Sequence, residues 1–191
     1  RSVASLEDPV EVVVPGVAQA QVNEPAGFTM ATGLRSLLRQ DPEVIFIGEI
    51  RDAAVAEVAL QAALTGQLVV TTFHAGNCAE VVHRLTEMSL PAYAINHAVR
   101  LIIAQRLVRQ LCNCAKAGDP ARDAAPLGFH VDTCRLAVGC DRCRQTGYHG
   151  RRLIAESQVV GTVDDNRPTL WNAAEELITE GVTSPMEASR V

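Results

Sequence analysis

Hydrophobic residues occur along the chain in short runs separated by longer amphipathic segments, which is the pattern of an α/β protein. Val44–Ile47 is a run of four apolar residues closed by Gly48, and it predicts a strand buried on both faces. Arg1–Leu6 and Leu68–Thr72 predict two further strands. Because helical segments lie between these runs, we expect parallel strands joined by right-handed crossovers.

Helical periodicity marks the segments between and after the strands. These segments are Thr29–Gln40, Ala53–Leu64, Ala79–Met88 and a long helix from Pro91 to about Gln110. Asp52 is placed to cap the second of them, and Gly66 is placed to end it in the left-handed conformation. We expect residues 1–110 to form the main domain.

The remainder of the chain is less regular. Residues 111–151 are rich in Cys, Gly, Asp and Pro, and this segment is too short to build a core of its own. Residues 152–191 predict a strand at Arg152–Val160, a helix at Thr169–Glu180, and a short helix that a capping box starts at Ser184. We therefore expect a cysteine loop followed by a small C-terminal region.

Composition and charge narrow the class of protein. The 191 residues carry a net charge of −5, which argues against a general grip on nucleic acid. No apolar run approaches the roughly 18 residues of a membrane span. The first residues lack the charged-then-apolar pattern of a signal peptide, so we expect none here. Because the chain starts abruptly and without Met, we expect that it begins inside a domain. Six cysteines in an α/β pattern suggest a metal site or free thiols rather than disulfides.

Acidic and imidazole side chains follow all three predicted strands. Glu7 and Asp8 follow the first, Glu49 follows the second, and His74 follows the third. The carboxyl ends of parallel strands share one edge of a sheet, and open α/β folds bind ligands at that edge. We therefore expect these side chains to converge, although Glu49 taken alone could equally be a solvated loop acid.

Taken in order, these pieces resemble the ATPases of type II secretion and type IV pilus assembly, which are hexameric P-loop motors. The segments that carry the resemblance are an acidic box at Leu6–Pro9, Leu34–Pro42, a Walker B segment at Val44–Asp52, a histidine box at Gly66–His74, Ala104–Arg109, and a cysteine segment at Cys140–Arg151. The resemblance covers nearly the whole chain. It implies an incomplete RecA-like sheet with helices, followed by a zinc-type cysteine loop and C-terminal helices.

Two departures from the family pattern have consequences. The phosphate-binding loop G-x-x-x-x-G-K-[ST] does not occur in these residues, and in the family it lies shortly before the position of Arg1. We therefore expect that this chain by itself neither binds ATP tightly nor hydrolyses it. Gln67 stands where the family usually has the first histidine of its box, so a cationic role is in doubt at that position.

The resemblance implies phosphoryl transfer from ATP to water with Mg²⁺. Glu49 would polarise the attacking water, Glu7 would organise waters around the metal, and His74 would sense the γ-phosphate. For His74 the alternative is an ordinary loop histidine. Residues expected to contact the nucleotide or a neighbouring subunit are Asp8, Arg35, Arg39, Arg51 and Gln67, with Asp8 more suited to holding its turn. For the three arginines the alternative is a salt bridge on a helix face.

The cysteines raise a separate question. Cys140 and Cys143 have the two-residue spacing of half a zinc knuckle. The other half, Cys112 and Cys114, is one residue shorter than in the family, so chelation requires a turn at the intervening residue. We expect these four to bind structural Zn²⁺, with Cys134 a substitute ligand. The alternative is a metal-free loop with reduced thiols.

The family also implies partners and a location. The intact protein would be a homohexamer on the cytoplasmic face of the inner membrane, where it contacts secretion or pilus platform proteins, and it would bind no nucleic acid. Arg106 and Arg109 would lie on the long helix near a ring interface or on a solvated face. The alternative function is a non-catalytic zinc-binding interaction module of the same assembly. A DNA-directed motor is disfavoured by the acidic charge balance.

Overall fold

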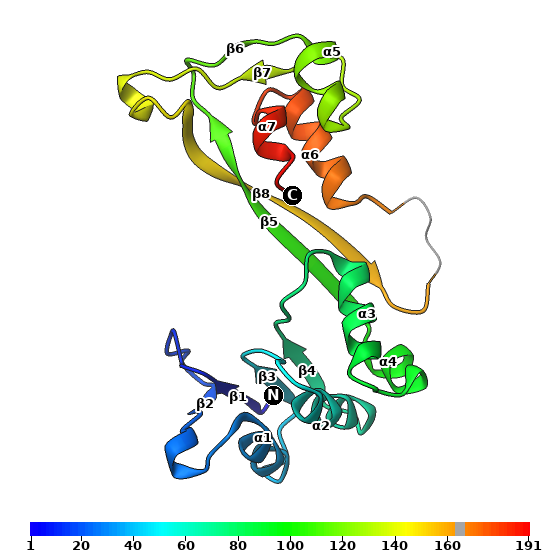
Figure 1. The fold of residues 1–191 in the computed structure, drawn as a ribbon. Coiled ribbons are helices and arrows are strands. Elements are labelled where there is room, and N and C mark those ends of the chain that lie inside the picture. The colour runs from blue at the N-terminus through cyan, green and yellow to red at the C-terminus, as the bar shows by residue number, and fades with distance from the viewer. Residues whose placement is uncertain (163–166) are drawn as a thin grey trace. The chain divides into compact units, whose positions relative to one another are not determined.

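The computed structural model describes residues 1–162 and 167–191, which form two compact units (Figure 1). The first unit consists of Arg1–Ile102 with Val159–Thr162, and the second consists of Ile103–Gln158 with Val163–Val191. Each unit is described by itself below.

A four-stranded parallel sheet forms the centre of the first unit. Its strands are β1 (Val3–Glu7), β2 (Ala18–Gln21), β3 (Val44–Ile47) and β4 (Leu68–Thr71), and their order is β2-β1-β3-β4. Leu6 of β1 is in register with Ile47 of β3, which is in register with Thr71 of β4. The three strands therefore end at one edge, as the order of predicted elements required.

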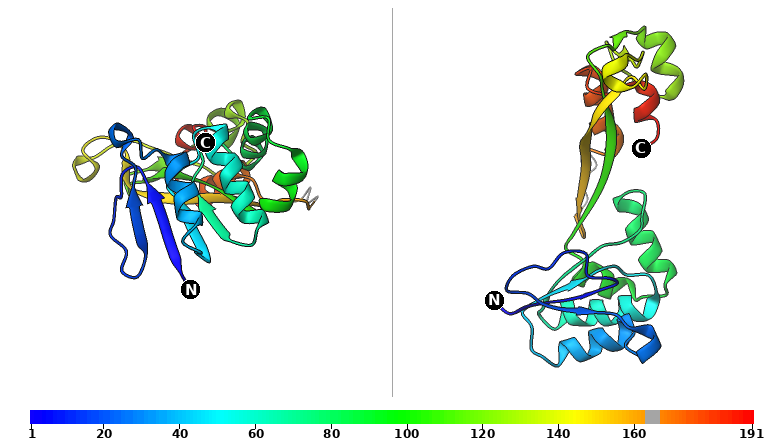
Figure 2. Two further views of the ribbon diagram at one scale, coloured as in Figure 1. Left: turned by 90° about the horizontal axis from the view of Figure 1, so that it is seen from below. Right: turned by 90° about the vertical axis from the view of Figure 1, so that its left-hand side faces the viewer.

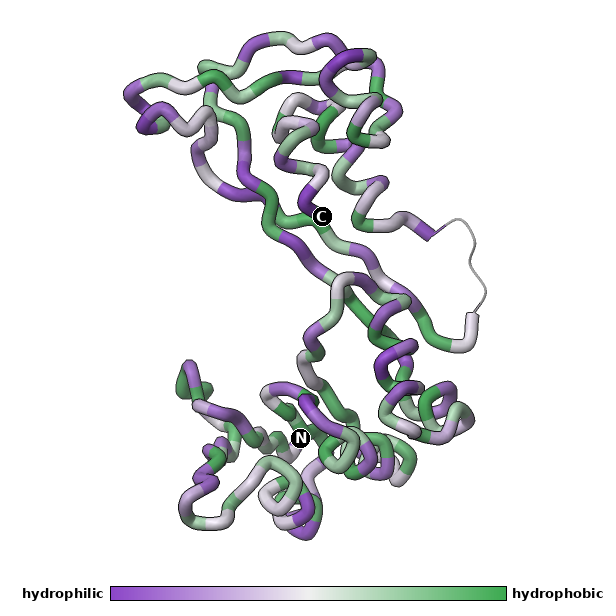
Figure 3. Tube along the Cα trace, in the orientation of Figure 1, coloured by the Kyte–Doolittle hydropathy of each residue, from purple (hydrophilic) through white to green (hydrophobic). Residues whose placement is uncertain are grey.

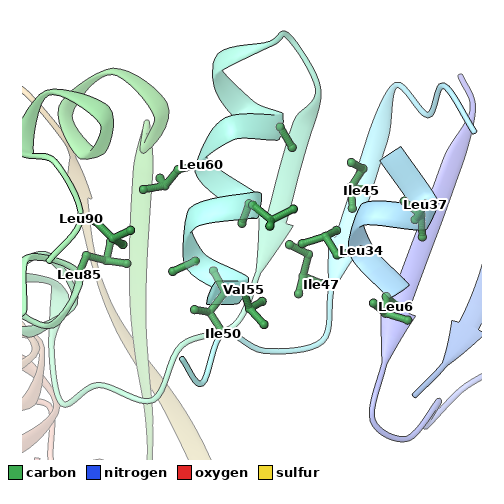
Figure 4. Close-up of a cluster of buried hydrophobic side chains, with 14 of the residues drawn as sticks. Leu6, Leu34, Leu37, Ile45, Ile47, Ile50, Val55, Leu60, Leu85 and Leu90 are labelled. Atoms are coloured by element: carbon green, nitrogen blue, oxygen red, sulfur yellow. The ribbon is translucent and has the colours of Figure 1, made fainter. Parts of the chain in front are cut away.

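The helices α1 (Met30–Leu38) and α2 (Ala53–Leu64) pack against this sheet. The helix α4 (Ala92–Ala98) packs on α2, and α3 (Cys78–Glu87) packs on α4. A short 3-10 turn, η1 (Glu24–Ala26), follows β2. Leu6, Leu34, Ile45 and Ile47 are fully buried in the resulting core (Figure 4). Figure 2 shows α1 and α2 on the same face of the sheet.

The start and end of α2 follow the sequence signals. The side chain of Asp52 accepts a hydrogen bond from the backbone N–H of Val55 at 2.9 Å, which satisfies a free amide of the first turn. Gly66 follows the helix with φ 111°, a region that side chains with a Cβ rarely enter. The predicted cap and stop are both confirmed.

The second unit is built around a two-stranded ribbon. Its strands are β5 (Leu101–Leu111) and β8 (Tyr148–Val159), and a second small ribbon pairs β6 (Lys116–Ala117) with β7 (Arg135–Leu136) in antiparallel fashion. The helices are α5 (Pro120–Asp123), η2 (Ala125–Leu127), η3 (Asp141–Cys143), α6 (Leu170–Thr179) and α7 (Pro185–Ala188). The rings of Phe129 and Trp171 stack with centroids 4.2 Å apart.

The predicted long helix from Pro91 to about Gln110 is wrong. The structure has the short helix α4 and then the strand β5, so Arg106 and Arg109 lie on a strand. Within β5, Ile102, Ala104 and Val108 are buried, whereas the neighbouring Leu101, Ile103 and Leu107 are each more than half exposed. Buried and exposed positions alternate over the first half of β5, as a strand requires. Figure 3, coloured by residue hydropathy, shows that β5 carries both apolar and polar residues.

At the start of α7, only one of the two hydrogen bonds of the predicted capping box is formed. Ser184 Oγ accepts the N–H of Glu187 at 3.2 Å, as predicted, but the Glu187 carboxylate turns to Arg109 instead of completing the capping box. It accepts from the backbone N–H of Arg109 at 3.1 Å, from Nε at 2.9 Å and from Nη2 at 2.5 Å. The Arg109 guanidinium also lies 4.1 Å from the centre of the Tyr148 ring, so one ion pair ties α7 to the ribbon.

Replacing Glu187 with Ala is expected to lower the free energy of unfolding by about 2 kcal/mol, because it removes charge-assisted bonds to a largely buried group. Burial alone would raise the pKa of Glu187, but the bonds and charge of Arg109 outweigh it and hold the pKa below 4.5. The contribution is therefore present above pH 4.5 and is lost as the pH falls through the folded-state pKa.

Urea unfolding of the native chain and of Glu187→Ala, at pH 7 and at about pH 3, measures this change in the free energy of unfolding. The exposed Glu180 on the neighbouring helix end is the matched control, and its replacement by Ala should change little. A Glu187→Ala loss that is as large in acid as at neutral pH would contradict the role of the ion pair.

Candidate functional site

Short polar loops follow β1, β3 and β4 at a shared edge of the sheet. Gly48 N–H donates to the carbonyl of Leu6 at 2.8 Å, and Ile50 N–H donates to the carbonyl of Thr72 at 3.1 Å. The hydroxyl of Thr72 donates to the carbonyl of Gly48 at 2.5 Å. These bonds extend the pairing of the strands beyond their ends, so the loop residues that follow are held together.

Glu49 is the acid at the centre of this edge. Its side chain is 17% exposed, and Nε2 of His74 lies 3.0 Å from its Oε2. No donor among the described residues is aligned on Oε2 as a hydrogen bond. The carboxylate therefore keeps a shielded oxygen that can accept a hydrogen bond from a water or a ligand.

Arg51 joins the acids that follow β1 and β3. Its guanidinium contacts Oε1 of Glu49 and lies 3.3 Å from Oδ2 of Asp8. The hydrogen bond from Arg51 is the main cause that lowers the pKa of Glu49, with a further contribution from His74, while partial burial opposes it. Glu49 is therefore an ionised acceptor at neutral pH.

Glu7 is the last residue of β1 and lies at the same edge, but its carboxylate has other partners. Its Oε1 accepts from the Ser5 hydroxyl at 2.6 Å and from Nε2 of Gln19 at 2.9 Å. Ser5 of β1 is in register with Gln19 of β2, and Glu7 comes two positions after Ser5, so both β1 side chains lie on the same strand face beside Gln19. These bonds, first that of Ser5 and then that of Gln19, lower the pKa of Glu7.

An open polar depression of ≈ 620 Å³ lies beside Arg51. The residues that line it are Asp8, Gln21, Val22, Asn23, Glu24, Pro25 and Arg51. Its polar walls can hold a hydrated, charged group next to the Asp8–Arg51 pair.

Three residues expected to contact nucleotide or a subunit lie elsewhere in this unit. Arg35 and Arg39 are exposed at the C-terminal end of α1, where Nη2 of Arg39 donates to the Ser36 hydroxyl at 3.4 Å. Gln67 precedes β4 and accepts from the hydroxyl of Thr65 at 2.8 Å, so it lies at the opposite end of that strand from His74. The structure therefore does not bring these three side chains to the Glu49 edge.

Four cysteine sulfurs of the second unit meet in one place. The Sγ atoms of Cys112, Cys114, Cys140 and Cys143 all lie within 4.8 Å of one another. Three of the separations are 3.9, 3.9 and 3.8 Å. A tetrahedron with Zn–S bonds of about 2.3 Å has edges of about 3.8 Å, so the cluster is compatible with zinc.

The backbone around the cluster favours the thiolate form of one sulfur, that of Cys143, whereas at Cys114 a backbone hydrogen bond is outweighed by burial and the neighbouring sulfurs, which raise the pKa to about 11. The N–H groups of Cys140 and Gly147 each donate to Sγ of Cys143 at 3.2 Å. Burial raises the pKa of Cys143, but these backbone bonds and the neighbouring sulfurs outweigh it and lower the pKa to about 6. Gly147 has φ 77°, and a Cβ there would lie 2.6 Å from that of Ala137, so only glycine fits.

The turn that the short cysteine spacing required is present. Ala115 N–H donates to the carbonyl of Cys112 at 2.9 Å, which turns the chain at Asn113 and lets both sulfurs face the cluster. Cys134, the substitute ligand that the sequence left open, is buried, and it is outside this group of four among the described residues.

Several residues that shape the site were not identified from the sequence. Ser5 could have been found, because a hydroxyl two residues before an acid on a strand shares its face. Gln19, Thr72 and Arg84 carried no such signal, since their partners depend on strand register and loop path. Arg84 lies on α3, and its Nη1 donates to the backbone carbonyl of His74.

Together these features define an α/β protein with a charged site at the carboxyl edge of a parallel sheet and a four-cysteine cluster. Solved structures share the fold. They include the pilus retraction motor PilT with bound ADP (TM-score 0.69, 24% identity, covering 98% of this chain and 51% of that one). Another is the Legionella pneumophila ATPase DotB (TM-score 0.67, 22% identity, covering 100% and 51%).

The chain belongs to the type II/IV secretion system protein family, whose model matches residues 1–183. The predicted family is thereby confirmed. Relatives include the putative type II secretion system protein E of Escherichia coli K12, 42% identical over 165 residues that are 84% of this chain and 34% of the relative. The type IV pilus assembly ATPase PilB of Thermus thermophilus is 43% identical over 168 residues, which cover 84% of this chain and 19% of that relative. The type II secretion system protein E of Pseudomonas aeruginosa is 35% identical, with 100% and 43% covered.

This chain spans 19–43% of the length of those three relatives. In the described part of the chain, no helix combines the length and the apolar character needed to cross a bilayer.

The hydrogen bonds to Glu7 predict a measurable carboxyl titration. In the native chain the pKa of Glu7 lies below 4.5, and replacing Ser5 with Ala should move it upward because the largest stabilising bond to the ionised form is lost. Carboxyl carbon NMR across pH 2 to 7 measures the shift. Ser36→Ala on α1 is the control, and an unmoved Glu7 titration in Ser5→Ala would contradict the assigned bond.

Proposed function

We propose that this chain supplies part of the catalytic domain of an ATPase that powers type II secretion or type IV pilus assembly. The observation that carries the proposal is the meeting of Glu49 and His74 at 3.0 Å, with Arg51 bridging Glu49 to Asp8, at the edge where α/β folds bind ligands. Family membership and the names of the relatives support the same function.

The reaction is phosphoryl transfer to water, for which a protein mainly provides positioning and charge. Bound MgATP would supply the phosphoanhydride bond and the metal charge. Glu49 offers Oε2 to orient the attacking water and to accept its proton. His74, whose side chain is 86% exposed, reaches from the next strand toward the transferred group.

Neighbouring charges complete the proposed site. Arg51 lies between the carboxylates of Glu49 and Asp8, and its hydrogen bond lowers the pKa of Glu49. Glu7, held by Ser5 and Gln19, would organise waters around the metal from the β1 side. Arg35 and Arg39 are exposed on α1 and are proposed to contact a neighbouring subunit, with Gln67 a subunit contact rather than a nucleotide contact because of its place before β4.

The full-length protein is proposed to work as a homohexamer at the cytoplasmic face of the inner membrane, bound to platform proteins of the assembly. The phosphate-binding loop would come from outside these residues, because G-x-x-x-x-G-K-[ST] is absent from them. This chain by itself is accordingly expected to be inactive.

The four-cysteine cluster is proposed to bind structural Zn²⁺. Cys112 and Cys114 at the end of the β5 ribbon and the pair around η3 would supply the four thiolates. The ion would hold this loop in place of a hydrophobic core. The cluster also favours the second candidate function, a non-catalytic zinc-binding module that docks to the same assembly. ATP turnover by the full-length protein distinguishes the two.

In the full-length protein, replacing Glu49 with Gln should leave ATP bound but lower turnover by roughly 10²–10⁴-fold, because the amide cannot take a proton from water. Steady-state ATP hydrolysis and nucleotide titration measure the two quantities. Glu57→Gln on the exposed surface of α2 is the control and should keep full activity. Near-normal turnover in Glu49→Gln would remove this residue from the mechanism.

Native mass spectrometry should find one zinc ion per chain, and a strong chelator should remove it. Cys140→Ser should lose the ion because a tetrahedral site needs all four thiolates, whereas Cys134→Ser should retain it. An unchanged mass with and without chelator, or loss of the ion in Cys134→Ser alone, would refute the proposed ligand set.

A further inference from the structure

The loop between β4 and α3 carries His74 on an exposed path. The imidazole is 86% exposed, so packing does not hold the ring against Glu49. Its distance to Glu49 therefore depends on how the backbone of this loop is fixed.

Two side chains of α3 bind that backbone. Nη1 of Arg84 donates to the carbonyl of His74, and Oε2 of Glu80 accepts the N–H of Gly76. The same two side chains pair with each other, with Nε of Arg84 3.3 Å from Oε1 of Glu80. One residue pair thus binds the loop at two points, on either side of Ala75.

The helix that presents this pair is well anchored. Asn77 caps its start by accepting the N–H of Glu80 at 2.9 Å, and Cys78 and Leu85 are buried on its inner side. Because α3 is anchored in the core, the hydrogen bonds from Arg84 and Glu80 can restrain the backbone of the loop.

We propose that Arg84 and Glu80 are positioning residues that hold His74 at its distance from Glu49. The inference rests on the proposed ATPase function and adds two residues that touch neither the substrate nor Glu49. Their effect on turnover would come from the loop backbone, since a small displacement of a reacting group can slow a reaction by about 10²-fold.

Helix stabilisation alone does not account for this arrangement. Both side chains are partly exposed, at 45% and 37%, and exposed i,i+4 pairs contribute little to stability. The same helix carries a second such pair, His83 with Glu87 at 3.3 Å, which lies further from the loop at the C-terminal end of α3 and serves as an internal control.

The test uses the full-length protein with Arg84→Met, Arg84→Lys and the charge swap Glu80→Arg with Arg84→Glu. The swap keeps an i,i+4 ion pair but puts an acid beside the His74 carbonyl and a donor beside the Gly76 N–H. Glu87→Gln is the control for the loss of an i,i+4 side-chain contact on α3. Steady-state ATP hydrolysis, thermal unfolding and amide exchange at Gly76 are measured for each.

We expect Arg84→Met and the swap to lower kcat roughly 10–100-fold while KM for ATP stays within about twofold. Exchange at Gly76 should quicken, the melting temperature should stay unchanged, and Arg84→Lys should recover part of kcat. Glu87→Gln should behave as the native protein.

Native kcat in the swap, or unchanged exchange at Gly76, would overturn the proposal. A fall in kcat that tracks a fall in melting temperature across all variants would also overturn it, because a merely structural role predicts that result. Failure of the proposed function looks different, since Glu49→Gln would then keep its turnover.

Discussion

The parallel register of β1, β3 and β4 is the constraint on which the rest of the first unit depends. Leu6, Ile47 and Thr71 lie side by side, so each strand releases its next residues at the same edge. An antiparallel neighbour would send its loop to the opposite edge. Buried apolar side chains fix this register, because a shift by one residue would turn Ile45 and Ile47 out of the core.

The loops beyond that edge are shaped by polar interactions rather than by packing. Glu49, Arg51 and Asp8 form a chain of charges, and Glu7 is turned toward Ser5 of its own strand and Gln19 of the neighbouring strand β2. Two acids that come from the ends of adjacent strands therefore have different surroundings. The strand register brings both acids to one edge of the sheet. The local hydrogen bonds then determine which partners each carboxylate has.

Much of the first unit could be predicted from the sequence because its signals are local. The Asp52 cap, the Gly66 stop and the apolar run Val44–Ile47 each depend on neighbouring residues only. The segment Leu101–Leu111 was mistaken for helix because its leucines and arginines also fit a helical period. Pairing with β8, a partner distant in sequence, made it a strand.

The candidate site was predictable to the same extent. The rule that parallel strands end together placed Glu49 and His74 near each other, and the structure has them at 3.0 Å. The sequence could not show that Glu7 binds Gln19 or that Arg84 binds the loop of His74. Those contacts depend on how side chains from different elements are placed in the folded chain. Likewise, spacing alone left Cys134 an alternative to Cys112 or Cys114, because the approach of their sulfurs to Cys140 and Cys143 depends on the turn after Cys112.

The closeness of the cysteine sulfurs links this loop to the redox state of its surroundings. Separations of 3.8 and 3.9 Å suit thiolates that share one cation, but a disulfide bond is only about 2 Å long. Oxidation of two of these cysteines to a disulfide would pull their sulfurs together and distort the tetrahedral arrangement. The proposed zinc site and oxidation would therefore compete for the same four sulfurs, and a reducing environment would preserve the zinc site.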